Sequence, residues 1–261
     1  MNSPEYISSL RHDIGVMTQA ARSVGLDVGV PTCPGWTMRD LITHTGAVHR
    51  HKSETLRGDY GSRPAPLPET PSSELSDASV LAWFDEGAAE LLDVCATADL
   101  DAPTWTWCPH EHSNAWWLRR MAHETVIHGS DAVIAAGGHP EIAEWLAVDG
   151  VDEIMDEFLV SAPLWGTVTP TGGVVRLEAS DRTWSVRLAE FSGASPTSGD
   201  EFLGLRKLVY DDGAEPEAVV STDPGSLDLW LWGRGDLPDG AAHGDLTIVD
   251  GLRATAADGT G

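Results

Sequence analysis

The chain has 261 residues, 41% of them hydrophobic and 22% charged, an ordinary globular composition long enough for one large domain or two modest ones. Its formal net charge of −25 at pH 7 disfavours nucleic acid as a partner, because phosphate binding depends on Lys and Arg displacing condensed counterions. No apolar run approaches the roughly 20 residues that cross a bilayer, and no signal-peptide pattern opens the sequence, so we expect a cytoplasmic protein without a membrane partner.

The first half of the chain predicts a bundle of four helices. Apolar residues recur every three to four positions from Tyr6 to Met17, as in a helix packed on one side. The predicted helices run over 4–24, from the N-cap Thr37 through at least Val48, over 76–98 and over 114–136. The proline-rich stretch 62–73 predicts a loop. Four long helices with intervening loops are typical of a helical bundle.

The pattern changes beyond about Gly150. Residues 173–180 and 183–191 show the branched and aromatic alternation of strands, and the Ser-Asp-Arg segment between them predicts a turn. Residues 218–234 predict a strand, a turn capped by Asp223 or Ser226, and a short helix. The last eight residues predict a frayed tail. We therefore expect two domains, a helical bundle over 1–150 and a small α+β domain over 151–261.

Three isolated cysteines indicate no disulfide framework. Cys33, Cys95 and Cys108 form no CxxC pair, which fits a reducing cytosol. Cys33 precedes a proline at a predicted helix entry, with no base beside it in sequence. We interpret it as a structural thiol rather than a nucleophile.

Glu124 and His128 carry the strongest signal for chemistry. They are four residues apart on a predicted helix, so their side chains share one face and can chelate a metal ion. A third ligand must come from elsewhere, and His44 is our choice because Leu41 and Val48, three before and four after it, point it inward. His49 and His51 are weaker candidates. The segment HETVIH differs from HExxH because its two histidines are five residues apart.

Two further side chains lie on the same helical face. Arg120, four residues before Glu124, either pairs with that acid or binds a substrate carboxylate. Asp131, three residues after His128, either accepts a proton from a metal-bound imidazole or is an ordinary acid near the helix end.

Three blocks of sequence resemble the mycothiol-dependent maleylpyruvate isomerase family. They are PTCPGWTMRDLITHTGAVHRH, WWLRRMAHETVIHGSDA, and LWLWGRGDL followed by HGDLTIVDG, in the family's order and spacing. The resemblance implies a DinB-like four-helix bundle that holds one zinc ion on the residues matching His44, Glu124 and His128. It also implies a small C-terminal domain similar to sterol carrier proteins. Arg234 matches a functionally important arginine of that domain, although pairing with an acid such as Asp245 is the structural alternative.

The expected function is zinc-dependent thiol chemistry. An ion with one open position lowers the pKa of a bound thiol, and the resemblance implies mycothiol as cosubstrate for S-transfer or for cis-trans isomerisation of a maleylpyruvate-like electrophile. The alternatives are a hydrolase that uses metal-bound water and a non-catalytic, metal-stabilised binding protein. Another divalent metal can replace zinc on these ligands. The expected partners are a small thiol and a small electrophile, with the chain as a monomer or homodimer.

Overall fold

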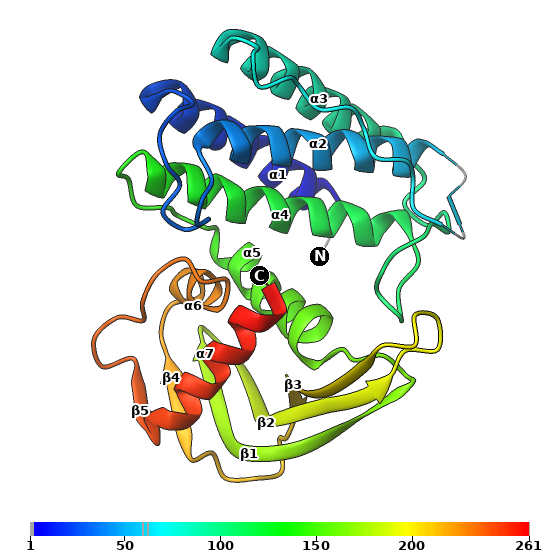
Figure 1. Ribbon diagram of the computed structural model, residues 1–261. Coiled ribbons are helices and arrows are strands. Elements are labelled where there is room, and N and C mark those ends of the chain that lie inside the picture. Colours follow the sequence, from blue (N-terminus) through cyan, green and yellow to red (C-terminus); the bar gives the residue numbers. More distant parts are fainter. Residues whose placement is uncertain (1–2, 59, 62, 261) are drawn as a thin grey trace. The chain divides into compact units, whose positions relative to one another are not determined.

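The computed structural model describes residues 3–58, 60–61 and 63–260, and the chain divides into two compact units, Met1–Glu141 and Ile142–Gly261 (Figure 1). The first unit is helical and the second contains a sheet, which confirms the predicted fold class of a helical bundle followed by a small α+β domain. The boundary predicted near residue 150 falls inside the helix that opens the second unit. No described helix combines the length and apolar character needed to cross a bilayer.

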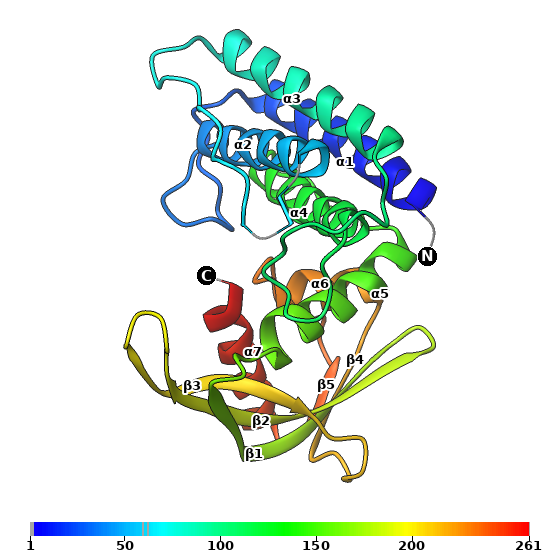
Figure 2. The same cartoon turned by 90° about the vertical axis from the view of Figure 1, so that its right-hand side faces the viewer.

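Four long helices form the first unit. They are α1 (Ser3–Val24), α2 (Met38–Arg57), α3 (Asp77–Thr97) and α4 (Asn114–Ala135), and each lies where the sequence predicts a helix. Helix α1 packs on α4 and α2 packs on α3, while contacts between α2 and α4 and between α1 and α3 close the bundle (Figures 1 and 2). Of the predicted loop 62–73, the described residues form no helix or strand, and Ser62 lies outside them.

Side-chain caps set where the helices begin. The Thr37 hydroxyl accepts a hydrogen bond from the Asp40 backbone, and the Asp40 carboxylate accepts one from the Thr37 backbone, which completes a capping box at the start of α2. The hydroxyls of Ser76 and Ser113 cap α3 and α4 by accepting hydrogen bonds from the backbones of Ser79 and Trp116. These caps satisfy backbone donors that a helix leaves unpaired in its first turn.

A continuous apolar core holds the bundle together. Its fully buried members come from all four helices and from the α1–α2 connection, and include Met17, Leu26, Leu41, Ile42, Phe84 and Ala132. Burying such side chains contributes about 1.5–3 kcal/mol each relative to exposure. The core fixes α2 against its neighbours and thereby fixes the direction in which the polar side chains of α2 point.

The second unit is built on one mixed sheet. Its strands are β1 (Gly166–Ala179), β2 (Arg182–Ala194), β3 (Glu201–Tyr210), β4 (Ala218–Ser221) and β5 (Ala242–Gly244), in the spatial order β3-β2-β1-β4-β5. All neighbours pair antiparallel except β1 and β4, which are parallel. The predicted Ser-Asp-Arg turn joins β1 to β2, and Ser180 there adopts a φ of 51°.

Helices of the second unit gather on one face of this sheet (Figures 1 and 2). Helix α5 (Glu144–Glu153) continues directly into a π-helical segment, η1 (Ile154–Val160), and packs on α6 (Pro224–Leu231). Of the two predicted caps for α6, Asp223 is the one observed, because its carboxylate accepts a hydrogen bond from the Ser226 backbone.

We predicted a frayed tail for the last eight residues, and this prediction is wrong for every one of them that the structure describes. Helix α7 (Leu246–Thr260) includes this segment, and Gly261 lies outside the described residues. Ile248, Leu252 and Ala256 recur every four residues and are buried, and α7 contacts β1 and β3. Packing of this apolar face against the sheet outweighs the low helix propensity of the Gly and Thr residues.

We predict that Thr37→Ala lowers the free energy of unfolding by about 1 kcal/mol, because the hydroxyl acceptor of the capping box is lost. Urea denaturation followed by circular dichroism measures the change. Thr37→Ser keeps the hydroxyl and is the matched control, expected to unfold like the wild type. Equal destabilisation by both substitutions would contradict the capping role.

Candidate metal centre

Three side chains from two helices converge inside the bundle. His44 comes from α2, and Glu124 and His128 come from one face of α4, where their spacing of four residues stacks them. The Nε2 atoms of His44 and His128 each lie 3.4 Å from Oε1 of Glu124. All three donor atoms lie within 4.8 Å of one another.

This geometry fits a metal ion. Ligand atoms in a tetrahedral zinc site lie about 2.0–2.1 Å from the ion and hence roughly 3.3 Å from each other, close to the two observed separations. Two imidazole nitrogens and one carboxylate oxygen are also a donor set that divalent zinc accepts. Within the part of the chain that the structure describes, no fourth His, Cys, Asp or Glu joins this group.

Arg120 keeps Glu124 ionised. Burial works against the charged form, but the Arg120 guanidinium and the hydrogen bonds with His128 and His44 outweigh it and hold the pKa of this carboxyl well below its usual value. Arg120 donates from Nη2 to Oε2 of Glu124, the predicted pairing, which leaves Oε1 toward the two imidazoles. The carboxylate is therefore ready to accept a cation.

Asp131 orients the His128 ring. Nδ1 of His128 lies 2.9 Å from Oδ2 of Asp131, and since a carboxylate accepts, the ring nitrogen donates. The fully buried Asp131 also accepts from the Thr32 hydroxyl and from Cys33 Sγ at 3.4 Å. Burial opposes the charged imidazolium, but the hydrogen bonds with Asp131, Cys33 and Glu124 outweigh it and raise the pKa of His128 well above its usual value.

A second group of donor atoms overlaps with the first. Cys33, His128 and Asp131 also lie within 4.8 Å of one another. The 2.9 Å contact between Nδ1 and Oδ2 is a hydrogen-bond distance, and it commits the Nδ1 proton to Asp131. The other ring nitrogen, Nε2, faces Glu124 in the first group, so this second group fits an orienting role better than a second ion.

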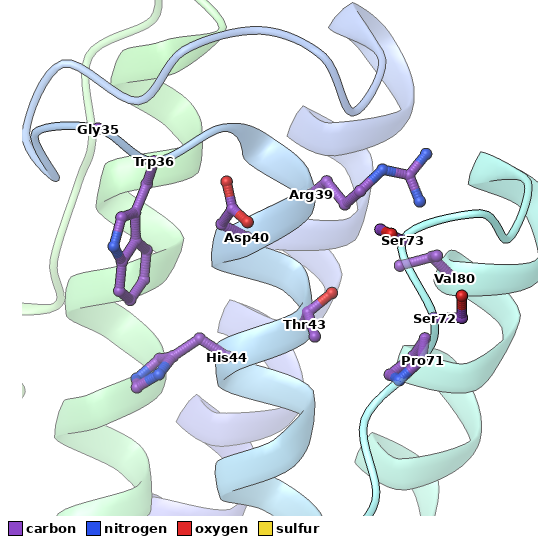
Figure 3. A pocket seen from close by; sticks show the side chains of 10 residues that line it. All are labelled: Gly35, Trp36, Arg39, Asp40, Thr43, His44, Pro71, Ser72, Ser73 and Val80. Atoms are coloured by element: carbon purple, nitrogen blue, oxygen red, sulfur yellow. The ribbon is translucent and has the colours of Figure 1, made fainter.

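Trp36 closes one side of the cluster. Its ring lies 5.0 Å from the His44 ring and 6.2 Å from the His128 ring, nearly parallel to the latter at 25°. A pocket of about 460 Å³ opens beside it, lined by Gly35, Trp36, Arg39, Asp40, Thr43, His44, Pro71, Ser72, Ser73 and Val80. Figure 3 shows Trp36 and His44 together on one side of this pocket and Pro71 and Ser72 on the other. The His44 side chain is 40% exposed, so the cluster is reached from this side.

The two weaker candidates point elsewhere. His49 is fully buried with Nε2 2.9 Å from the Thr125 hydroxyl, and Nε2 of His51 donates to the Ala65 carbonyl at 2.9 Å. Neither belongs to a described group of potential metal ligands.

Lys52, which the sequence did not single out, lies close to Glu124. It lies on α2 with only 7% of its surface exposed, and its Nζ is 3.5 Å from the centre of the Trp117 ring. Burial lowers the pKa of its ammonium to about 8, even though Glu124 favours the charged form. The signal in sequence was its position two turns after His44 on the same helix, combined with the scarcity of lysine in the chain.

Arg234 lies in the second unit, in the turn after α6. Its backbone N–H donates to Leu229 and its guanidinium donates to the Trp232 carbonyl. Asp245, which we weighed as an example of an acid partner, accepts hydrogen bonds from the backbone and the hydroxyl of Thr247. The predicted carboxylate-binding role of Arg234 stays a prediction.

Both units match family models of known proteins. Residues 10–133 match the family model of the mycothiol maleylpyruvate isomerase N-terminal domain, and residues 146–255 match the MDMPI C-terminal domain. Among solved structures, the mycothiol-dependent maleylpyruvate isomerase is similar at 15% identity and a TM-score of 0.57, and a histidine-to-alanine mutant of it at 14% and 0.59. Each comparison covers 90% of both chains. None of the curated proteins matches the sequence.

We predict that His49 makes the bundle sensitive to acid. Burial is the main cause that lowers its pKa to about 4, whereas an unfolded histidine titrates near 6.5. The unfolded chain therefore binds the extra proton first, and stability falls as the pH decreases from about 6.5 towards 4, by up to about 3 kcal/mol. Urea denaturation of chelator-treated protein between pH 7.5 and 4.5 measures this slope.

In that experiment His49→Gln should show a shallower decline than the wild type, while substitution of the exposed His139 should leave the slope unchanged. Parallel pH profiles for His49→Gln and wild type would rule out the buried neutral imidazole as a cause.

Proposed function

The chain belongs to the mycothiol maleylpyruvate isomerase family, and from that premise we propose that it is a metal-dependent enzyme using mycothiol, or a similar small thiol, to isomerise a conjugated electrophile. Its ion, zinc or another divalent metal, is held by His44, Glu124 and His128. The observation that carries this proposal is the convergence of two Nε2 atoms on one carboxylate oxygen at 3.4 Å each.

When bound, a divalent ion supplies Lewis-acid chemistry that lowers the pKa of a neighbouring thiol, so that a thiolate is present at neutral pH. In a maleylpyruvate-type reaction the thiolate sulfur adds to the conjugated double bond, and the π electrons move onto the carbonyl oxygen. Rotation about the new single bond follows. The electrons then return, the C–S bond breaks, and the trans double bond forms with the thiolate released.

The protein's own groups prepare this site before any ligand arrives. Asp131 holds the Nδ1 proton of His128, so Nε2, which faces Glu124, is the nitrogen that would coordinate the ion once the proton it carries at the raised pKa has left. Arg120 binds Oε2 of Glu124 and fixes its other oxygen for coordination. Arg234 stays a proposed ligand for a carboxylate, since a guanidinium binds such a group through two parallel hydrogen bonds.

Two observations favour this function over a closed structural site. His49 and His51 make hydrogen bonds elsewhere, so neither supplies a fourth ligand, and a small molecule can take that position. The pocket of about 460 Å³ beside His44 also leaves room for one. A hydrolase using metal-bound water shares these features, and the tests below separate the two reactions.

Removing any one of the three proposed ligands should empty the site. We predict that His44→Ala, Glu124→Ala and His128→Ala each lower the metal content of purified protein well below that of the wild type, measured by elemental analysis. Asp131→Asn should weaken metal affinity by about 10- to 100-fold, because the orientation of His128 is lost.

The matched control is His51→Gln on the same helix, which should retain wild-type metal content because His51 is bonded to the Ala65 carbonyl. Full metal retention in all three ligand variants would contradict the assignment of His44, Glu124 and His128 as metal ligands.

The thiol reaction has a direct spectroscopic test. We predict that cobalt-substituted protein titrated with mycothiol develops a saturable sulfur-to-cobalt charge-transfer band, and that maleylpyruvate then isomerises only when thiol is present. Hydrolysis of esters without thiol would support the hydrolase instead. Bound metal with no such band, and unfolding on chelation, would indicate a structural ion.

A further inference from the structure

Lys52 presents an unpaired positive charge inside the bundle. The residue is only 7% exposed, and its ammonium forms no hydrogen bond or ion pair among the residues that the structure describes. Its ammonium instead lies over the face of Trp117, 3.5 Å from the ring centre. Such a contact offsets only part of the free energy that removing an ammonium from water costs.

The buried groups around Lys52 also carry more positive than negative charge. Arg120 is 6% exposed, and both cations act electrostatically on Glu124, the carboxylate that Arg120 already binds. A divalent ion on the proposed ligands, together with Lys52 and Arg120, carries four positive charges. Glu124 and Asp131 offset two of them, so two positive charges remain. A thiolate accounts for one of them. One further anion is needed before the buried cluster is neutral.

We propose that Lys52, with the adjacent Arg120, binds one carboxylate of an anionic electrophile and thereby selects substrates of that class. The ammonium has three N–H donors and no protein acceptor in the described residues, so a carboxylate satisfies it without displacing an existing ion pair. This inference rests on the proposed function, because the bound anion is taken to be the substrate of that reaction. Binding of the anion itself is measured without thiol and without turnover.

The first test compares maleate, a dianion, with its neutral dimethyl ester on zinc-loaded protein, using isothermal titration calorimetry. Lys52→Met keeps the apolar stem and removes the charge, so it should weaken maleate binding by at least about tenfold and leave metal content unchanged. Lys52→Arg should retain most of the affinity. Lys207→Met removes the chain's only other lysine and is the matched control, expected to bind maleate like the wild type.

A second test needs no variant. Because the chain has only two lysines, reductive methylation followed by mass spectrometry reports each of them separately. Maleate should protect Lys52 and leave labelling of Lys207 unchanged, while the dimethyl ester should protect neither. Wild-type affinity for maleate in folded Lys52→Met, or equal labelling of Lys52 with and without maleate, overturns the inference. Maleate binding that depends on Lys52 in protein without a cobalt-thiol band supports the inference and contradicts the proposed function.

Discussion

The contact between α2 and α4 is the constraint on which the site depends. His44 belongs to one helix and Glu124 and His128 to the other, so their donor atoms meet only because the two helices pack side by side. That packing is stabilised by an apolar core that includes Leu41 of α2 and Ala132 of α4, which have no role in the chemistry. The packed core therefore fixes the position of this polar cluster, as a preorganised site requires.

The buried carboxylates of Glu124 and Asp131 are tolerated because each has charged or hydrogen-bonding partners. Glu124 stays ionised beside Arg120, and Asp131 is held by three donors from two segments of the chain, Thr32 and Cys33 before α2 and His128 on α4. A hydrogen-bonded carboxylate of this kind fixes both the tautomer and the direction of a metal-binding imidazole. The α1–α2 connection thus contributes to the site without supplying a ligand.

The second unit shows how local and long-range signals differ. The β1–β2 hairpin was predictable because its alternation and turn chemistry are contained in about twenty residues. Strand β3 and helices α5 and α7 escaped prediction, since their sequences are weakly patterned and they gain stability from the sheet and from one another. The Gly-rich end of α7 is helical for that reason. Propensity is a small term that such packing reverses.

The sequence by itself determined the four helices of the bundle, the Thr37 cap of α2, and the shared face of Glu124 and His128, because all of these depend on spacings within one or two helical turns. Its periodicity also pointed His44 inward, and family resemblance joined it to the other two. Only the tertiary structure decided that His49 and His51 turn to other partners, that Thr32 and Cys33 reach Asp131, and that Lys52 lies beside Glu124. Each of these contacts joins residues from separate segments. Helical periodicity indicates which face of its own helix a side chain occupies, but it does not indicate which residues of other segments that side chain contacts.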